Sequence, residues 1–379
     1  MSRLPIDPEL PQTEDFERIF LEDVPLMDVR APVEFADGAF PQASNLPLID
    51  DLERHDIGTT YKQQGQDAAI AEGLKRVSGA LKQQRVAAWE AFAREHPEGI
   101  LYCFRGGMRS QIAQQWLHDA TGISYPRIRG GYKALRRYLI DQLTLNASRM
   151  RPVVIGGRTG AGKTRLIQEL TPRIDLEDLA WHRGSAFGRH ATAQPAQVSF
   201  ENALSVQLLR IVKTGNPFFV AEDESRNIGA RHIPMAFFEH FSRAPVVVLE
   251  ATVEERIAVT REEYVHEALT EYVALAGPDA GWEQWADYLR DSLTRIRKRL
   301  GGVNYQRISD LLENALRKHR ESGDTGAHDD WIEALLIDYY DAMYRYQLEQ
   351  KQNRIRFAGN RDQVMEYLKE EFGIGRAEK

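Results

Sequence analysis

The chain has 379 residues, of which 42% are hydrophobic and 28% charged, with one cysteine and a formal net charge of −7. This length exceeds what one ordinary core serves, so two or three domains are expected, and the composition is that of a soluble globular protein. The single cysteine excludes an internal disulfide. No apolar run approaches the roughly 18 residues of a membrane span, and the polar N-terminus does not resemble a signal peptide. We therefore expect a cytoplasmic protein with no membrane partner.

The first predicted strand, over residues 25–30, ends in the charged residues Asp28 and Arg30. Residues 31–35 favour a helical turn, because proline is tolerated at the first positions of a helix. Taken alone, these charges and that of Glu34 are typical of an exposed surface. Residues 57–94 place apolar side chains at helical spacing and predict two helices. These helices either pack on a sheet as an insertion or form part of a site wall.

The only cysteine, Cys103, lies where the apolar run 100–102 meets a glycine-containing loop. The run predicts a strand, and Ser110 predicts the N-cap of a following helix. Loop N–H groups and the positive end of a helix bind anions, and nearby arginines favour a thiolate. We interpret Cys103 as a nucleophile for a phosphate-like or sulfur-transfer substrate rather than as a buried apolar side chain. The candidate anion loop comprises Arg105, Gly106, Gly107, Arg109 and Ser110.

Residues 124–151 are locally basic within an acidic chain. A basic run is usually a solvated face, but this one lies between two anion-binding motifs and also suits an RNA backbone. The sequence leaves both interpretations open. The RNA-binding candidates are Arg127, Arg129, Lys133, Arg136 and Arg137.

The segment 152–164, PVVIGGRTGAGKT, is a short apolar run followed by the complete G-x-x-x-x-G-K-T pattern. Its glycines allow backbone N–H groups to surround phosphate oxygens, its lysine reaches the outer phosphates, and its threonine hydroxyl can hold Mg²⁺. A helical pattern follows, so strand, loop and helix are all predicted. The expected diphosphate-binding residues are Gly157, Gly160, Gly162, Lys163, Thr164 and, further along the chain, Arg226.

A buried strand predicted over residues 217–221 ends in the acidic residues Glu222, Asp223 and Glu224. Acidic residues at this place hold Mg²⁺ or position water beside a P-loop, so Thr164 and Asp223 are the candidate metal ligands. A strand over 246–249 and a helix over 254–265 continue an alternation that predicts a parallel sheet. The segment around His182 is equally consistent with a surface loop and with a part of the phosphate site.

From about residue 266 the pattern is helical, and its aromatic stripes predict packed helices rather than a binding surface. A basic cluster over 295–299 is a weaker RNA candidate. The expected fold class is therefore α/β. It comprises an N-terminal domain over 15–140, a P-loop NTPase-like parallel α/β domain over 150–265 and a helical C-terminal region over 266–379.

Residues 28–47, DVRAPVEFADGAFPQASNLP, resemble the first signature of rhodanese-type sulfurtransferase domains, and residues 129–132, RGGY, resemble the closing Gly-Gly element of that family. Cys103 lies between them, where the rhodanese nucleophile belongs. The resemblance implies a rhodanese-like domain over 15–140. The loop from Cys103 to Arg109 is one residue longer than in sulfur-transferring rhodaneses. It resembles the loops of related phosphatases and arsenate reductases, which implies a phosphate-sized oxyanion instead of thiosulfate.

Four motifs in order, CFRGGMRS, GGRTGAGKT, HRGSAFG and EDESRNIG, closely resemble the tRNA 2-selenouridine synthase family over nearly the whole chain. The resemblance implies an enzyme that replaces sulfur by selenium in the 2-thiouridine at the wobble position (position 34) of tRNA. It implies selenophosphate as the selenium donor and an S-geranyl-2-thiouridine intermediate made from geranyl diphosphate. It further implies that Cys103 attacks or carries selenium and that the P-loop binds the geranyl donor. No tightly bound cofactor is expected, although Mg²⁺ suits the P-loop.

Two other classes of function remain open from the sequence. The chain is consistent with a P-loop kinase or ATPase fused to a Cys-x5-Arg phosphatase-like domain. It is also consistent with a non-catalytic tRNA-binding module whose cysteine loop only senses anions. ATP turnover without tRNA would favour the first, and normal function of a Cys103→Ala variant would favour the second.

Overall fold

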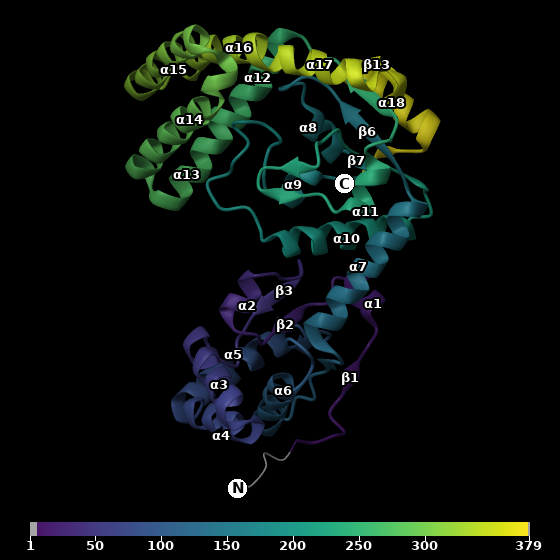
Figure 1. The fold of residues 1–379 in the computed structure, drawn as a ribbon, viewed down its shortest axis with the longest axis vertical. Helices are drawn as coiled ribbons and strands as arrows, with labels where there is room; N and C mark the ends of the chain where they lie inside the picture. Colours follow the sequence, from purple (N-terminus) through teal and green to yellow (C-terminus); the bar gives the residue numbers. More distant parts are fainter. Residues whose placement is uncertain (1–5, 378–379) are drawn as a thin grey trace. The chain divides into compact units, whose positions relative to one another are not determined.

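The structure, a computed structural model, describes residues 6–377. The chain forms two compact units, and neither is a single contiguous segment. The first comprises residues 1–143 and 196–210, and the second comprises residues 144–195 and 211–379. Each unit is organised around a five-stranded sheet (Figure 1). Among the described residues, no helix is both long enough and apolar enough to cross a membrane.

The first unit contains a sheet in the order β1-β5-β4-β2-β3, in which all neighbouring strands are parallel. β2 and β4 are buried along their whole length, as is usual for a parallel sheet covered on both faces. β4 is the central strand, so the residue after it lies at the middle of the carboxyl edge, where ligands of parallel sheets bind. The strands are β1 (Gln12–Thr13), β2 (Leu26–Asp28), β3 (Ala43–Asn45), β4 (Ile100–Tyr102) and β5 (Arg127–Ile128).

The helices of the first unit include α2, which confirms the helical turn predicted at residues 31–35. The prediction of two helices over 57–94 is wrong, because three helices occupy this stretch. Gly65, with φ at +87°, ends α3 and begins α4. The apolar spacing continues across this glycine, so the pattern alone does not reveal the break between the two helices. The helices are α1 (Phe16–Leu21), α2 (Pro32–Ala36), α3 (Asp51–Gln64), α4 (Gln66–Arg76), α5 (Gly79–Glu95), α6 (Met108–Thr121) and most of α7 (Gly131–Arg149) and α10 (Gln197–Lys213).

Asp28 and Arg30 are buried, so the structure favours a pair that supports the sheet over charges on an exposed surface. Arg30 Nη2 donates to Asp28 Oδ2 at 2.6 Å and to the Gly38 carbonyl at 2.8 Å. The guanidinium also lies 3.9 Å from the ring centroid of Tyr132 at the start of α7. This buried pair therefore fastens the carboxyl end of β2 to the loops around it.

The second unit contains a sheet in the order β13-β12-β6-β9-β8, again entirely parallel. The strands predicted over 152–155, 217–221 and 246–249 are confirmed as β6, β9 and β12. β6 is central, and the P-loop follows it. The strands are β6 (Arg151–Gly156), β8 (Arg173–Ile174), β9 (Phe218–Glu222), β12 (Val246–Leu249) and β13 (Ile355–Gly359), with the small antiparallel pairs β7 (Leu170–Thr171) with β14 (Gly375–Arg376) and β10 (Asn227–Ile228) with β11 (Arg231–His232).

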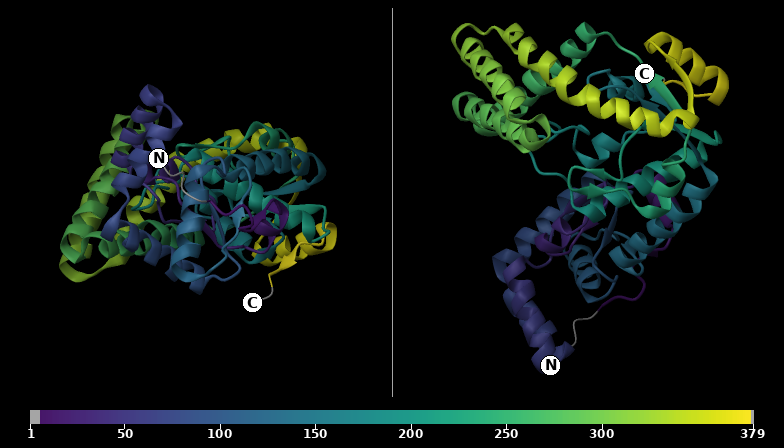
Figure 2. Two further views of the ribbon diagram at one scale, coloured as in Figure 1. Left: turned by 90° about the horizontal axis from the view of Figure 1, so that it is seen from below. Right: turned by 45° about the horizontal axis from the view of Figure 1, so that its top comes forward.

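The C-terminal region is mostly helical, and its aromatic stripes form one core, as predicted. The green helices α13, α14 and α15 lie side by side in Figure 2. The region is not purely helical, however, because β13 completes the sheet of the P-loop. Its short alternation of apolar and polar residues is inconspicuous in a charged stretch. The helices that lie wholly within the second unit are α8 (Lys163–Gln168), α9 (Leu176–Ala180), α11 (Met235–Phe241), α12 (Val253–Arg261), η1 (Glu262–Glu267), α13 (Ala268–Ala276), α14 (Pro278–Leu300), α15 (Gly302–Ser322), η2 (Thr325–His328), α16 (Asp329–Leu335), η3 (Leu336–Tyr340), α17 (Asp341–Lys351), η4 (Gln352–Arg354) and α18 (Arg361–Phe372).

Candidate functional site

Cys103 follows the central strand β4 directly and is buried, at 3% exposure. Its Sγ donates to Ser110 Oγ at 3.2 Å, and that hydroxyl donates to the Gly107 carbonyl at 2.9 Å. Ser110 is therefore not the N-cap that we expected. Helix α6 begins earlier, at Met108, with Gly107 as its N-cap. The serine instead lies in the first turn of α6 and holds the thiol against the loop.

The two Gly-Gly elements of the first unit are packed backbone against backbone. The Tyr132 N–H donates to the Cys103 carbonyl at 2.9 Å, and the Lys133 N–H donates to the Phe104 carbonyl at 3.1 Å. A Cβ at Gly131 would lie 2.3 Å from the Cys103 carbonyl oxygen, and one at Gly106 would lie 2.7 Å from the Gly130 nitrogen. Both glycines also have positive φ, so a side chain at either would displace the cysteine loop.

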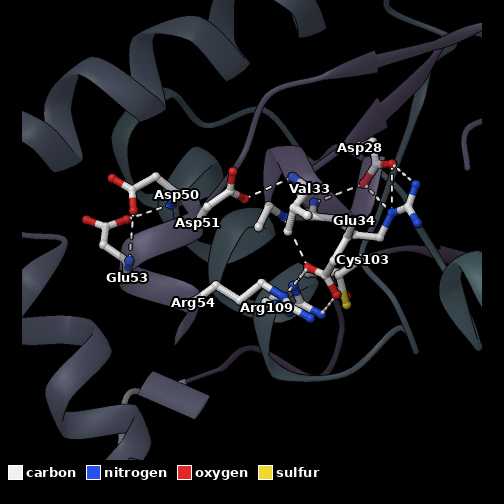
Figure 3. A network of polar contacts seen from close by, with 12 residues as sticks. Asp28, Val33, Glu34, Asp50, Asp51, Glu53, Arg54, Cys103 and Arg109 are labelled. Atoms are coloured by element: carbon white, nitrogen blue, oxygen red, sulfur yellow. Dashed lines mark hydrogen bonds and ion pairs between the residues drawn. The ribbon is translucent and has the colours of Figure 1, made fainter. Parts of the chain in front are cut away.

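The arginines of the cysteine loop have different partners. Arg109 forms an ion pair with Glu34 of α2, with Nη2 3.1 Å from Oε1 (Figure 3). Burial acts to raise the pKa of Glu34, but the hydrogen bonds and charge of Arg109 outweigh it and lower that pKa. The Arg109 charge also interacts with Cys103. Arg105 is exposed and is thus available to an incoming anion.

The five RNA-binding candidates do not form one surface. Arg127 is buried and donates to the Gly106 carbonyl at 3.1 Å, so it supports the cysteine loop from within. Arg136 is held by Asn202 and Glu201 of α10. Arg127 and Arg136 therefore have structural roles, and the prediction that they bind RNA is not supported. The exposed candidates are Arg129, Lys133 and Arg137.

The P-loop of the second unit has the predicted strand, loop and helix in order, from β6 to α8. Gly157, Gly160 and Gly162 have φ of +154°, +79° and +82°. A Cβ at Gly160 would lie 2.6 Å from Thr260 Oγ1, so α12 packs tightly on the loop. Lys163 Nζ donates to the Gly157 carbonyl at 3.1 Å and so lies across the loop that would receive phosphate.

Carboxyl groups on the partly buried side chains of Glu177 and Glu224 lie beside the threonine of the P-loop. Thr164 Oγ1 donates to Glu177 Oε2 at 3.0 Å, and Glu177 in turn shares a hydrogen bond with Glu224. Burial is the main cause that raises the pKa of both carboxyls. Glu222 ends β9, where its Oε2 accepts from the Leu176 N–H at 3.1 Å, and burial likewise raises its pKa. Glu177, which the sequence did not single out, is thus the direct partner of Thr164.

The two metal ligands proposed from the sequence, Thr164 and Asp223, contact different side chains. Asp223 accepts from Lys351 Nζ at 2.7 Å, whereas Thr164 faces Glu177. Within residues 6–377, no three His, Cys, Asp or Glu side chains are grouped so as to hold a metal ion. Arg226, the remaining phosphate candidate, is exposed immediately before the β10–β11 hairpin.

Residues distant in sequence also hold the P-loop in place. Arg256 of α12 is fully buried, and its Nε donates to the Thr159 carbonyl at 2.9 Å. The same guanidinium binds both carboxylate oxygens of Asp341 at 3.1 and 2.7 Å. Asp341 also pairs with Arg158 of the loop at 3.3 Å. Neither Arg256 nor Asp341 has a local motif that marks this role.

The segment around His182 is packed rather than exposed. His182 has 8% exposure, and burial, with the neighbouring positive charges, lowers its pKa to about 4. Ser185 Oγ accepts from the Tyr264 hydroxyl at 2.8 Å, and Arg183 pairs with Glu271 at 2.8 Å. These contacts tie the segment to η1 and α13, and His182 and Arg183 line a pocket together with Thr164 of the P-loop.

The fold and these two loops define a class of protein. It is a two-unit α/β protein in which one parallel sheet presents a cysteine beside a loop with glycines and arginines and the other presents a P-loop. Cysteine and P-loop each follow the central strand of their own sheet.

Comparison with known proteins identifies the family within this class. The family model described as the tRNA 2-selenouridine synthase AAA domain matches residues 150–373. A tRNA 2-selenouridine synthase of Marinobacter nauticus is 50% identical over 360 residues, which covers 95% of this chain and 98% of the relative. Those of Cupriavidus pinatubonensis and Azotobacter vinelandii are each 51% identical over 94% of this chain and 98% and 97% of the relatives. The chain belongs to the tRNA 2-selenouridine synthase family, a family of enzymes.

Proposed function

We propose that this enzyme replaces sulfur by selenium in the 2-thiouridine at position 34 of tRNA. We further propose that it uses selenophosphate and acts through an S-geranyl-2-thiouridine intermediate made from geranyl diphosphate. The observation that best supports a transfer enzyme is the cysteine placed after the central strand of a parallel sheet, beside an anion loop. The same arrangement supports a rhodanese-like first unit. Family membership supports the tRNA substrate.

The cysteine loop suits the phosphate part of selenophosphate. The exposed Arg105 and the N–H groups at the start of α6 offer donors to a tetrahedral anion. Cys103 lies at the base of this loop with its thiol oriented by Ser110, and we assign it the nucleophilic role. Its sulfur attacks the phosphorus of selenophosphate, the phosphorus–selenium bond breaks, and the selenide that leaves is available for the base. Water then cleaves the sulfur–phosphorus bond, which regenerates the thiol and releases inorganic phosphate. Glu34 is placed to limit the positive charge of the loop by pairing with Arg109.

The P-loop suits the diphosphate of the geranyl donor. In the proposed first step, the sulfur of 2-thiouridine attacks the first carbon of the geranyl group, the carbon–oxygen bond breaks and diphosphate leaves. The uracil ring loses its N3 proton, so the product is a neutral S-alkyl base. Lys163 is positioned to stabilise the negative charge of the departing diphosphate.

In the proposed second step, selenium from selenophosphate forms a bond to C2 of the S-geranyl base, and the carbon–sulfur bond breaks. Geranylthiol leaves with one proton, and the phosphate part is released as inorganic phosphate with the oxygen of one water molecule. Alkylation aids this step, because a thioether-like sulfur is a better leaving group than a thiocarbonyl sulfur.

Mg²⁺ remains a part of this proposal, because the oxygen donors of Thr164 and Glu177 are of the type that Mg²⁺ prefers. The ion would supply additional positive charge to the diphosphate. For tRNA, we propose the exposed residues Arg129, Lys133 and Arg137 as contacts with the phosphate backbone.

The test is nucleoside mass spectrometry of bulk tRNA from cells grown with selenite, comparing the wild type, a deletion strain and the deletion strain that carries Cys103→Ala. We expect 2-selenouridine only with the wild-type gene, and accumulation of the thio or geranylthio form with Cys103→Ala. Unchanged 2-selenouridine in the deletion strain would refute the tRNA assignment and favour a P-loop kinase fused to a phosphatase-like unit.

A further inference from the structure

A cavity of about 770 Å³ opens in the first unit beside the cysteine loop. Small-molecule sites usually occupy about 300–1,000 Å³, so this volume is sufficient for a ligand. Helices α3 and α4 provide one wall, and α6, which follows the cysteine loop, provides another. Arg105, Met108 and Arg109 of the loop and the first turn of α6 belong to the lining. A group held in this cavity would therefore lie next to the anion loop.

The lining changes character away from the loop. Next to the loop it is charged, because Glu34 pairs there with both Arg109 and Arg54, the latter at 3.4 Å (Figure 3). Away from the loop, α3 contributes the polar residues His55, Thr59 and Lys62, and the remainder is formed largely by branched and aromatic side chains from three helices. These are Ile57, Ile70, Leu74, Ile112 and Trp116. The cavity is thus suited to a ligand with a polar head at the cysteine loop and an apolar chain.

The sequence left two roles open for the helices predicted over residues 57–94, packing on the sheet or forming a site wall, and the cavity supports the second. Residues 51–76, which form α3 and α4, have apolar side chains that are only partly covered, among them Ile57 and Leu74. A helix pair that served only as packing would bury these side chains. An apolar chain in the cavity would cover them and gain the free energy of removing this surface from water.

We propose that this cavity receives the geranyl chain of S-geranyl-2-thiouridine while the base lies at the cysteine loop for selenium transfer. This inference rests on the proposed function and adds to it the place of the apolar chain in the second step. The chain would hold the base in position through its hydrophobic contact, and geranylthiol would leave through the open side of the cavity.

The test is a chain-length series. Anticodon stem-loop RNAs that carry S-methyl-, S-dimethylallyl- or S-geranyl-2-thiouridine are titrated into the full-length protein, and each dissociation constant is measured by fluorescence anisotropy. Ile70→Trp fills the cavity from α4. Ala71→Trp is the matched control, because Ala71 is the next residue of the same helix, is exposed and is outside the cavity lining.

We expect the wild type and Ala71→Trp to bind the geranyl RNA on the order of tenfold more tightly than the methyl RNA, which corresponds to burial of about two methylene groups. Ile70→Trp should lose this preference and bind the methyl RNA within about twofold of the wild type. A merely unfolded variant would lose affinity for every RNA, so unchanged methyl binding distinguishes the filled cavity from misfolding. Ile70→Ala, which enlarges the cavity, should keep the preference for geranyl.

Two results would overturn the inference. One is an Ile70→Trp variant that retains the geranyl preference and converts geranylated RNA to selenouridine at the wild-type rate. This result would exclude the cavity as the geranyl site but would leave the proposed function intact. The other is a concentration-dependent dimer, seen by sedimentation, that Ile70→Trp disrupts, because the cavity would then be an interface between copies. Failure of the wild type to convert any of the RNAs would instead refute the proposed function.

Discussion

The cysteine loop and the P-loop use the same backbone arrangement. Each follows the central strand of a five-stranded parallel sheet, contains at least one glycine with positive φ and opens a helix. Their side chains differ. Arg105, Arg109 and Arg127 surround the cysteine loop with positive charge, and Glu34 offsets it in part. The P-loop instead has partly or fully buried carboxyl groups next to its threonine, with raised pKa values.

In both loops the backbone forms the binding site for an anion. The side chains determine whether a proton or a cation must bind as well to balance the charge. The cysteine loop has the positive charge to hold an anion unaided. At the P-loop, the carboxyl groups must keep protons or gain a cation when an anion arrives, because uncompensated charge is costly in a buried site. The two loops therefore suit different steps.

The largest expected effect tests whether the two loops serve separate steps. Cys103→Ser should lower selenium transfer on the order of 10³-fold, because it removes the thiol and leaves the second unit intact. Geranylated tRNA should accumulate, as measured by nucleoside mass spectrometry. Ser110→Ala, which removes only the hydroxyl that holds the thiol, should have a smaller effect. Equal loss of geranylation in Cys103→Ser would show that one loop serves both steps.

The reciprocal change is Lys163→Ala. It should slow geranylation on the order of 10²-fold, because it removes the positive charge beside the departing diphosphate. Selenation of RNA that is supplied already geranylated should stay within about twofold of the wild type. Arg165→Ala is the matched control, since Arg165 lies on the same helix and its half-buried side chain pairs with Glu267. A Lys163→Ala variant that geranylates at the wild-type rate would remove the P-loop from this step.

A third change tests how much the buried ion pair between Asp28 and Arg30 stabilises the sheet that carries the cysteine loop. Asp28→Asn should lower the free energy of unfolding by about 3 kcal/mol, because it leaves the guanidinium of Arg30 buried without its negative partner. Urea denaturation monitored by circular dichroism measures the loss. Glu22→Gln, which breaks the exposed pair with Arg18, should cost less than about 1 kcal/mol. Equal costs would mean that the buried pair does not support the sheet.

The acidic character of the P-loop region predicts a pH effect on stability. Burial, followed by the charge of Glu177, raises the pKa of Glu263 from 4.5 to about 7. The folded chain thus keeps a proton that the unfolded chain releases, so the free energy of unfolding falls as the pH rises from about 4.5 to 7. Glu263→Gln should remove this loss and stabilise the protein by about 1–2 kcal/mol above pH 7, with no gain near pH 4. Thermal unfolding at both pH values tests it, with exposed Glu262→Gln as control. An equal gain at both pH values would contradict the assignment.

The smallest expected effect concerns RNA. Arg137→Ala should weaken tRNA binding about two- to threefold and reduce the slope of log affinity against log salt by about one, because one phosphate contact is lost. Arg94→Ala is the control, since both arginines are exposed and each pairs with an acidic residue four positions away. If Arg94→Ala has the same effect, the RNA surface is not specific to α7.

The local motifs were predictable, because their chemistry resides in adjacent residues. The strand before Cys103 and the whole of β6, P-loop and α8 follow from short patterns. The partners that complete each loop were not predictable, since they come from distant segments that no local pattern connects. Glu34 reaches Arg109 from α2, and Asp341 reaches the P-loop from α17. Arg127 belongs to a basic run, and only burial shows that it supports the cysteine loop.

The return of α10 to the first unit has a consequence for how the chain is made. Val206 and Leu209 of this helix belong to the same core as Phe20 and Leu26, and Asn202 donates to the Ala39 carbonyl at 2.8 Å. A ribosome that has synthesised residues up to 143 has therefore not yet supplied every part of that core. The first unit can close only after the P-loop has left the ribosome, so a chain interrupted between the two motifs would expose an apolar face to quality control.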